Sequence, residues 1–392
     1  MKRLVLPGCF VVLLALTNAW PDFSEGYERL GQTDTASYSA IALASPGIPQ
    51  SAVDYRHAQR FWLPWTIGAV AKYTHVPLVL AFRTTDFLLF VAVVWTFSRI
   101  LQTLQVSSDW QTVLLAGAIF DPYHGRYYLA VPFMVTDLLF LLGFAVTILG
   151  FVRKNFTIVA VGLTVAATGR QTALAVIGGL WILLGSRWRS KDVRSSDVIK
   201  LLAASMSAVA IYWLGGAFAQ ATGAANENIV TVTGHYEWLF SDDPHKVGTI
   251  LEFCLRGLPG LGPALVLIIP LLVITPLKPR MELGSIAFLS LSICIQPLLG
   301  GPAVTSNNIS RLTSFAHIGL LTIAGLLANR SGKSLRSGVT IIVCLLMFVA
   351  SLHHQWSLPG QLLSGPLQFG VLMMCSYMLA AISVWMSITQ EC

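Results

Sequence analysis

Long apolar runs separated by short polar segments dominate the chain. Residues 138–151, 341–350 and 371–386 lie in windows that approach the ~20 residues with which a helix crosses a bilayer core. The pattern predicts an all-α, polytopic bundle of about ten to twelve transmembrane helices. We place these helices at residues 4–20, 84–104, 109–120, 129–151, 155–169, 171–186, 199–218, 258–276, 283–299, 312–328, 338–352 and 366–388.

Charged residues are too few for a soluble protein of this length. Of the 392 residues, 55% are hydrophobic and 11% are charged, and the mean hydropathy is +0.70. A soluble domain carries roughly 25% charged residues. Most of the surface must therefore face lipid rather than water, and we treat residues 1–392 as a single transmembrane domain.

Many of the 25 basic residues recur in short clusters between the apolar runs. Such clusters mark the cytoplasmic side of a membrane protein, whereas a nucleic-acid-binding protein presents a continuous basic surface. With Lys2 and Arg3 in the cytoplasm, both termini are cytoplasmic. We expect a multi-pass protein of a bacterial inner membrane that binds no nucleic acid. A cleaved signal peptide at residues 1–20 is the alternative to a retained first helix.

On this topology the long polar segments are external, and the two largest are the loops at residues 21–83 and 219–257. The inner loops are short and basic. A transporter more often shows polar residues in the middle of its spans and internal inverted repeats, and we find no convincing repeat. The external loops are therefore the expected working part of the molecule.

Two helical stretches are predicted in the first external loop, at Thr35–Ala44 and from about Ala52 to Tyr73. The second stretch mixes basic and aromatic residues, as a helix lying on the membrane surface does. These residues are Arg56, Arg60, Phe61, Trp62, Trp65 and Lys72. We expect both helices to lie along the membrane.

Asp34 precedes the first of these stretches, and Tyr38 follows one turn later. A carboxylate at the membrane surface has the chemistry of a general base that takes a proton from an acceptor hydroxyl. The alternative is that Asp34 is the N-cap of the helix, since Asp favours that position. One residue can serve both roles.

The short external loop at residues 121–128 contains Asp121, His124 and Arg126. An acid, an imidazole and a guanidinium this close together could supply a second acidic group or bind phosphate. Asp-Pro followed by Gly is equally the chemistry of a turn, and the sequence does not separate the two interpretations.

Asp137 lies within an otherwise apolar predicted span. Ionisable residues at such depth are costly and usually face the interior of the bundle or a wet cavity. We expect Asp137 either to face the site or to pair with Arg126 or Arg170.

Arg170 and Gln171 interrupt an apolar stretch, and Arg311 lies at the external mouth of a span. A guanidinium is the natural bidentate partner of a phosphate group. A single arginine at such a place more often packs its stem in lipid and extends its head to water. Two arginines on the same side as the acidic residues favour a site for a lipid phosphate.

Metal ligands are a further interpretation of the loop 219–257, which contains His235 and Glu237. A solvated loop of this size collects such residues in any case, so no metal ligand is assigned. A divalent metal stays an open alternative for the site as a whole.

The order of these features resembles the GT-C class of membrane glycosyltransferases, and most of all its small bacterial polytopic members. These enzymes have an acidic residue in the first external loop, where Asp34 stands, and helices that lie along the membrane. They often have a second acidic position in the next external loop, where Asp121 stands. A Pro-x-x-x-x-Asp pattern at the start of the fourth span is matched by Pro132 and Asp137. This chain lacks a tight pair of acidic residues in the first loop.

The resemblance implies transfer of a sugar from a polyprenyl-phosphate-linked donor to an acceptor on the non-cytoplasmic face. Asp34 would deprotonate the acceptor hydroxyl, with Asp121 as the second catalytic acid. Arg170, Arg311, or Arg56 with Arg60, would neutralise the departing lipid phosphate. The other residues expected to bind substrate are Tyr38, His124, Arg126, Asp137 and Gln171.

Two other functions use similar residues. A transporter or flippase for a lipid-linked sugar would use the same arginines for phosphate but needs no catalytic carboxylate. An O-antigen-type polymerase is an enzyme with two lipid-linked substrates. The sequence identifies neither the sugar nor the acceptor.

Overall fold

Every predicted span corresponds to a helix, and no strand occurs among the residues described by this computed structural model, which confirms the all-α prediction. The described residues are 2–18, 20, 33–50, 53–189, 193–224, 250–251, 254–255, 257–275, 281–305, 309–352 and 366–390. The helices are α1 (Lys2–Leu16), α2 (Thr33–Ala44), α3 (Tyr55–Ala58), α4 (Trp62–Thr74), α5 (Leu78–Thr103), α6 (Ser108–Ile119), η1 (Pro122–Arg126), α7 (Tyr127–Ala130), η2 (Pro132–Met134), α8 (Val135–Val152), α9 (Phe156–Gly169), α10 (Ala173–Arg189), α11 (Ser195–Ala221), η4 (Leu258–Leu261), α14 (Gly262–Ile274), α15 (Met281–Thr305), α16 (Ile309–Ser314), α17 (His317–Ser331), α18 (Ser337–Ser351) and α19 (Pro366–Thr389).

Four helical segments of the described chain are long and apolar enough to cross a membrane. They are α5, the segment Pro132–Val152 that contains α8, α11, and Gly370–Thr389 of α19. Six shorter apolar stretches of 10–17 residues accompany them among the described residues. By length and composition, the chain is an integral membrane protein.

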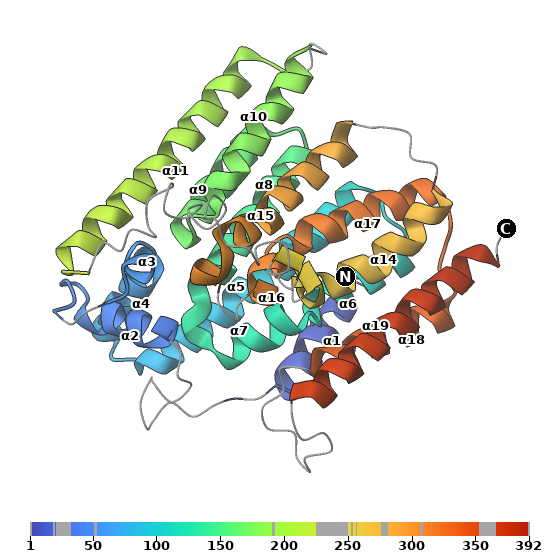
Figure 1. The fold of residues 1–392 in the computed structure, drawn as a ribbon, viewed down its shortest axis with the longest axis horizontal. Helices are drawn as coiled ribbons and strands as arrows, with labels where there is room; N and C mark the ends of the chain where they lie inside the picture. The colour runs from blue at the N-terminus through green and yellow to red at the C-terminus, as the bar shows by residue number, and fades with distance from the viewer. Residues whose placement is uncertain are drawn as a thin grey trace.

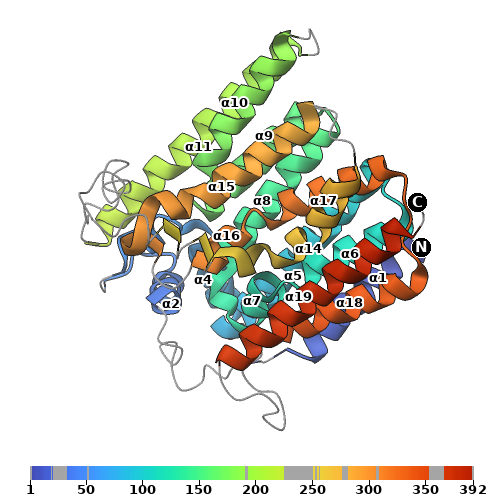
Figure 2. The same cartoon turned by 45° about the vertical axis from the view of Figure 1, so that its right-hand side comes forward.

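The helices form a central bundle with an outlying hairpin (Figure 1). In the apolar window that contains α8, 78% of the residues are buried, whereas the corresponding share in α11 is 22%. The hairpin of α10 and α11 projects at one edge of the bundle in both views (Figures 1 and 2). Most of the exposed residues of α11 are apolar, among them Met206 and Trp213, so α11 is suited to face lipid.

Glycines bring α8 and α9 into backbone contact. A Cβ atom on Gly162 would lie 2.5 Å from the backbone nitrogen of Thr147 in α8, and one on Gly169 would lie 2.5 Å from that of Phe140. Small residues allow this close approach, which is how helices commonly associate inside membranes. The start of α8 and the end of α9, where Asp137 and Arg170 lie, are consequently held side by side.

The predicted span 129–151 is interrupted near its start. Tyr127–Ala130 forms α7, Pro132–Met134 forms a 3-10 turn, and α8 begins only at Val135. Pro132 lacks an N–H and disfavours helical geometry in the residue before it, and Val131 has φ −119° and ψ 75°. Asp137 therefore lies in the first turn of α8, rather than within one continuous helix that begins at residue 129.

The first external loop differs from its prediction in three details. The expected helix from Ala52 to Tyr73 is two helices, α3 and α4. Helix α5 begins at Leu78, so its first turns lie in the stretch predicted as loop. Asp34 is inside the first turn of α2, which begins at Thr33, and the prediction that Asp34 is its N-cap is wrong.

Helices α2 and α4 pack closely, because Gly68 has no side chain and lies directly against the backbone of Ala42. In Figure 2 both termini lie together at one end of the molecule, and α2 and α4 lie towards the other end. The side of the membrane that each end faces stays a prediction. Most of the predicted loop 219–257, residues 225–249, lies outside the described residues.

Candidate active site

Two carboxylates share one guanidinium at the centre of the site. Arg311 of α16 donates from Nη2 to Oδ2 of Asp34 in α2 at 3.1 Å, and its Nε lies 3.7 Å from Oδ2 of Asp137 in α8. Arg170, at the end of α9, donates from Nη1 to Oδ1 of Asp137. Asp137 and Arg170 are 1% and 6% exposed. The expected pairing of Asp137 is thus with Arg170, and Arg126 does not take part.

The hydroxyl groups of two tyrosines in α7 complete this network. Arg311 donates from Nη1 to the hydroxyl of Tyr127 at 3.1 Å. The hydroxyl of Tyr128 lies 3.4 Å from Oδ2 of Asp137. Both tyrosines come from the short helix before the Pro132 break, so the interrupted span supplies polar groups at this depth.

Arg60 faces neutral partners. Its Nε donates to Oε1 of Gln171 at 2.8 Å, and its Nη1 lies 3.5 Å from the hydroxyl of Tyr38. Gln171 in turn donates to Oε1 of Gln59 at 2.7 Å. No carboxylate of the described chain lies within ion-pairing distance of Arg60, whose charge is therefore available to an anion.

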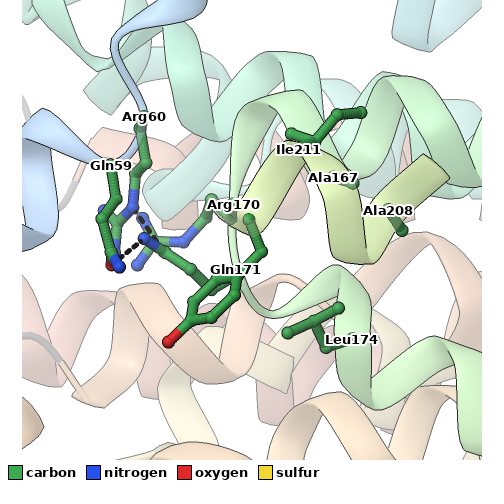
Figure 3. A pocket seen from close by; sticks show the side chains of 9 residues that line it. Gln59, Arg60, Ala167, Arg170, Gln171, Leu174, Ala208 and Ile211 are labelled. Carbon is green, nitrogen blue, oxygen red and sulfur yellow. Dashed lines mark hydrogen bonds between the residues drawn. The ribbon is translucent and has the colours of Figure 1, made fainter. Parts of the chain in front are cut away.

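A narrow cleft opens beside Arg60 and Arg170 (Figure 3). Figure 3 shows Gln171 between Arg60 and Gln59, with the apolar side chains on the other side of the cleft. The walls come from α9, α10 and α11, and are formed by Ala167, Leu174, Ala208, Ile211 and Tyr212. The cleft thus joins a cationic end to walls contributed by a lipid-facing hairpin.

Asp34 has a second partner, His57 of α3, whose Nε2 lies 2.5 Å from its Oδ1. Burial alone would raise the pKa of Asp34, but Arg311, His57 and Arg60 outweigh it and hold that pKa well below its usual range. Asp34 is therefore ionised at neutral pH. Its side chain keeps 16% exposure, so the carboxylate is not sealed from the site.

Asp121 and His124 belong to a separate buried cluster. Oδ1 of Asp121 accepts from the backbone N–H groups of Tyr123 and His124 at 2.7 and 3.1 Å. Oδ2 faces Nδ1 of His317 at 3.5 Å. Asp121 and His317 are 0% exposed and His124 is 3% exposed. The turn interpretation of this loop describes Asp121 well, since its side chain caps η1.

Two predicted arginines lie away from the site. Arg126 is 0% exposed and donates to the backbone oxygen of Thr17 at 2.9 Å and to Oγ of Ser351 at 2.8 Å, tying α1 to α18. Arg56 pairs with Asp54 at 3.3 Å with its side chain 35% exposed. Of the predicted residues, the structure brings together Asp34, Tyr38, Arg60, Asp137, Arg170, Gln171 and Arg311.

A divalent metal does not fit these residues. Each oxygen of Asp34 already has one donor, His57 on Oδ1 and Arg311 on Oδ2. Within the described ranges, no three His, Cys, Asp or Glu side chains gather as a metal site requires. No chemical step is assigned to a metal.

Sequence reasoning missed His57, Asp54, Tyr127 and Tyr128. His57 stands between Arg56 and Arg60 in the same short segment, so a histidine among interfacial basic residues was the available signal. The two tyrosines follow Arg126 directly at the end of the predicted loop 121–128, where no role was assigned to them.

No family model matches the sequence, and no curated protein matches it. One solved structure with the same fold is that of ArnT from Cupriavidus metallidurans bound to undecaprenyl phosphate. The alignment covers 99% of this chain and 74% of ArnT, with 11% identity and a TM-score of 0.54. The predicted GT-C-like fold is therefore confirmed at the level of architecture.

Proposed function

We propose that this protein is a membrane glycosyltransferase that moves a sugar from a polyprenyl-phosphate-linked donor to an acceptor on the non-cytoplasmic face. The main support for this proposal is an excess of positive over negative charge at the site. Arg60, Arg170 and Arg311 surround two carboxylates, Asp34 and Asp137, and Arg60 meets only neutral groups among the described residues. Arg60 is half-buried and has no carboxylate in direct contact, so a phosphate at the cleft would supply a negative charge for it to pair with.

The cleft fits the amphiphilic character of such a donor. Arg60 and Arg170 offer guanidinium donors suited to phosphate oxygens. The walls from Ala208 and Ile211 continue onto the lipid-facing surface of α11, along which a polyprenyl chain can stay in the bilayer. ArnT, which has the same fold, was solved with undecaprenyl phosphate, and this supports the proposal.

The reaction is a displacement at the anomeric carbon of the sugar. The acceptor oxygen forms a bond to that carbon while the bond to the phosphate oxygen breaks, and the electron pair leaves with the lipid phosphate. Asp34, ionised and partly accessible, takes the proton from the acceptor hydroxyl. Arg60 and Arg170 stabilise the negative charge that grows on the leaving phosphate.

The test is turnover of defined donors by the purified full chain in lipid nanodiscs. Undecaprenyl phosphate carrying a single pentose or hexose is supplied, and release of undecaprenyl phosphate is measured with water or an added alcohol as acceptor. We expect release by the wild type, and a loss of about 100-fold or more in Asp34→Asn. Binding of undecaprenyl phosphate should persist in that variant.

The outcomes separate the candidate functions. Unchanged turnover in Asp34→Asn would remove Asp34 from catalysis. Binding without release by the wild type, together with movement of the donor between leaflets of a liposome, would indicate a flippase instead.

A further inference from the structure

His57 connects Asp34 to a second carboxylate. Its Nε2 lies 2.5 Å from Oδ1 of Asp34, and its Nδ1 lies 3.3 Å from Oγ of Ser37 and 3.6 Å from Oδ1 of Asp54. The imidazole side chain is 8% exposed. One edge of the ring also meets Tyr38, with ring centroids 5.3 Å apart. The imidazole is thus held on four sides.

The chemistry of the partners fixes the ring. An ionised carboxylate only accepts hydrogen bonds, so Nε2 must carry a proton and donate it to Asp34. Nδ1 then accepts from the hydroxyl of Ser37 at 3.3 Å, while the Asp54 carboxylate acts on the ring electrostatically from 3.6 Å. Asp54 is itself immobilised, because its Oδ1 accepts from the backbone N–H of Arg56 at 2.8 Å. Histidines oriented by a carboxylate recur in enzymes where the geometry of the reacting group matters.

We infer that His57 is a positioning residue for the proposed transfer, which holds Asp34 against Arg311 and aims its free lone pairs at the acceptor. With His57 on one oxygen and Arg311 on the other, rotation of the carboxylate would break one of the two contacts. The inference rests on the proposed function, since it assigns His57 to the step in which Asp34 takes a proton. His57 does not line the cleft beside Arg60, and the inference gives it no contact with the donor.

His57 also sets the electrostatics of Asp34, together with the other groups that face it. The groups that face Asp34 or His57 are Tyr38 of α2, Asp54 and Arg56 at α3, Arg60 before α4, Tyr127 of α7, Asp137 of α8, and Arg311 of α16. Loss of the imidazole removes the interactions with His57 that lower the pKa of Asp34. The pKa of Asp34 should then rise, and the acid side of the rate profile should move to higher pH.

The experiment compares His57→Leu and His57→Gln with the control His75→Gln, which changes an exposed histidine at the end of α4. Release of undecaprenyl phosphate is measured against pH for each purified variant. We expect kcat to fall about 100-fold in His57→Leu, with KM for the donor unchanged and the acid limb shifted upward. His57→Gln keeps an N–H donor, so its kcat should be about tenfold higher than that of His57→Leu. The control should match the wild type.

A second measurement covers the case in which His57→Leu does not fold. In Asp54→Asn the imidazole loses the carboxylate beside its Nδ1, and we expect a smaller loss of kcat than in His57→Leu. The double variant Asp54→Asn/His57→Gln should lose less than the product of the two single losses, because both changes act through one contact. Independent, merely structural roles would multiply and would leave the acid limb in place. Such a result overturns the inference.

An observation free of turnover separates this inference from the proposed function. In chain labelled with ¹⁵N-histidine, the His57 signals are identified by their absence in His57→Gln, and Nε2 should carry a proton whose resonance changes in Asp34→Asn. If the wild type shows this signal but releases no lipid phosphate, the proposed function fails while the contact stands. If the wild type turns over and His57→Leu keeps both its rate and its acid limb, the positioning role fails alone.

Discussion

The two buried acidic residues Asp137 and Asp121 lie in opposite electrostatic surroundings. Asp137 is 1% exposed and is paired with Arg170 and close to Arg311. Asp121 is 0% exposed and has two backbone N–H groups on one oxygen, with the imidazole of His317 facing the other. Equal burial therefore does not mean equal chemistry. The guanidiniums make Asp137 part of a charged network, whereas Asp121 lies in a cluster without an ion-paired Lys or Arg among the described residues.

The state of His317 shows how Asp121 is accommodated. Nε2 of His317 lies 3.2 Å from the carbonyl oxygen of Gly117, and a carbonyl only accepts, so Nε2 carries the proton. Nδ1 then presents a lone pair towards Oδ2 of Asp121, 3.5 Å away, and carries no proton that would stabilise an ionised carboxylate. Burial raises the pKa of Asp121 well above its usual range, more than the hydrogen bonds from Tyr123 and His124 lower it. The resemblance makes Asp121 a second catalytic acid, and this stays a prediction; its surroundings favour a neutral carboxyl group.

The largest expected effect is on stability. Asp137→Asn should lower the free energy of unfolding by about 3–5 kcal/mol, because it leaves Arg170 and part of the Arg311 charge buried without a counter-ion. Asp121→Asn keeps the shape of a protonated carboxyl group and should cost about 1 kcal/mol or less. Both are measured by thermal unfolding of the purified variants in one detergent. Equal losses in the two variants would show that burial, and not the charge of the partners, decides the difference.

The next largest effect is on anion binding, and it tests whether the site that contains Asp34 and Asp137 has an excess of positive charge. Arg60→Ala should weaken binding of undecaprenyl phosphate about tenfold or more, since a hydrogen bond to a charged group contributes ~1.5–3 kcal/mol. The matched control is Arg56→Ala, which removes the same charge four residues away, from a half-exposed pair with Asp54. Binding is measured in nanodiscs by titration with the lipid. Parallel losses in both variants would mean that only the net charge of the loop matters.

The sequence predicted the helical fold because lipid imposes it. Uninterrupted apolar runs leave the backbone no hydrogen-bond partner other than itself, so each run becomes a helix, and the positions of α5, α9, α11 and α19 follow directly. Pro132 also marks a break in the helix, but the residues on both sides of it are apolar, so the pattern predicted one continuous span. Helix order was thus predictable, while the shift of Asp137 to the start of α8 depends on where the interrupted backbone resumes.

The site was only partly predictable because its members come from distant segments. Asp34, Asp137, Arg170 and Arg311 lie on different helices, and each stood out as an ionisable residue beside or within apolar sequence. The pairing of Asp137 with Arg170 was one expected alternative, but that of Asp34 with Arg311 could not be deduced, because it depends on how α16 returns to α2. His57 did not stand out in the sequence, because a histidine in a polar loop carries no cost of burial in lipid that distinguishes it from its neighbours.

The smallest expected effect is the pH dependence of stability, where the two regions should differ in sign. The pKa of Asp34 is lowered in the folded state, so its contribution is present above the ordinary Asp pKa of ~3.9 and is lost only as the pH falls below that value. The pKa of Asp121 is raised, so its contribution is complete below ~3.9 and is lost as the pH rises towards its folded-state pKa. Each unit of difference corresponds to ~1.4 kcal/mol, and relaxation around the carboxyl group should leave a net effect of about 1 kcal/mol. Thermal unfolding of the wild type and of Asp121→Asn from acid to neutral pH measures this effect. The wild type should lose stability relative to Asp121→Asn as the pH rises, whereas a constant difference between the two curves would mean that Asp121 is ionised and held by its backbone N–H groups.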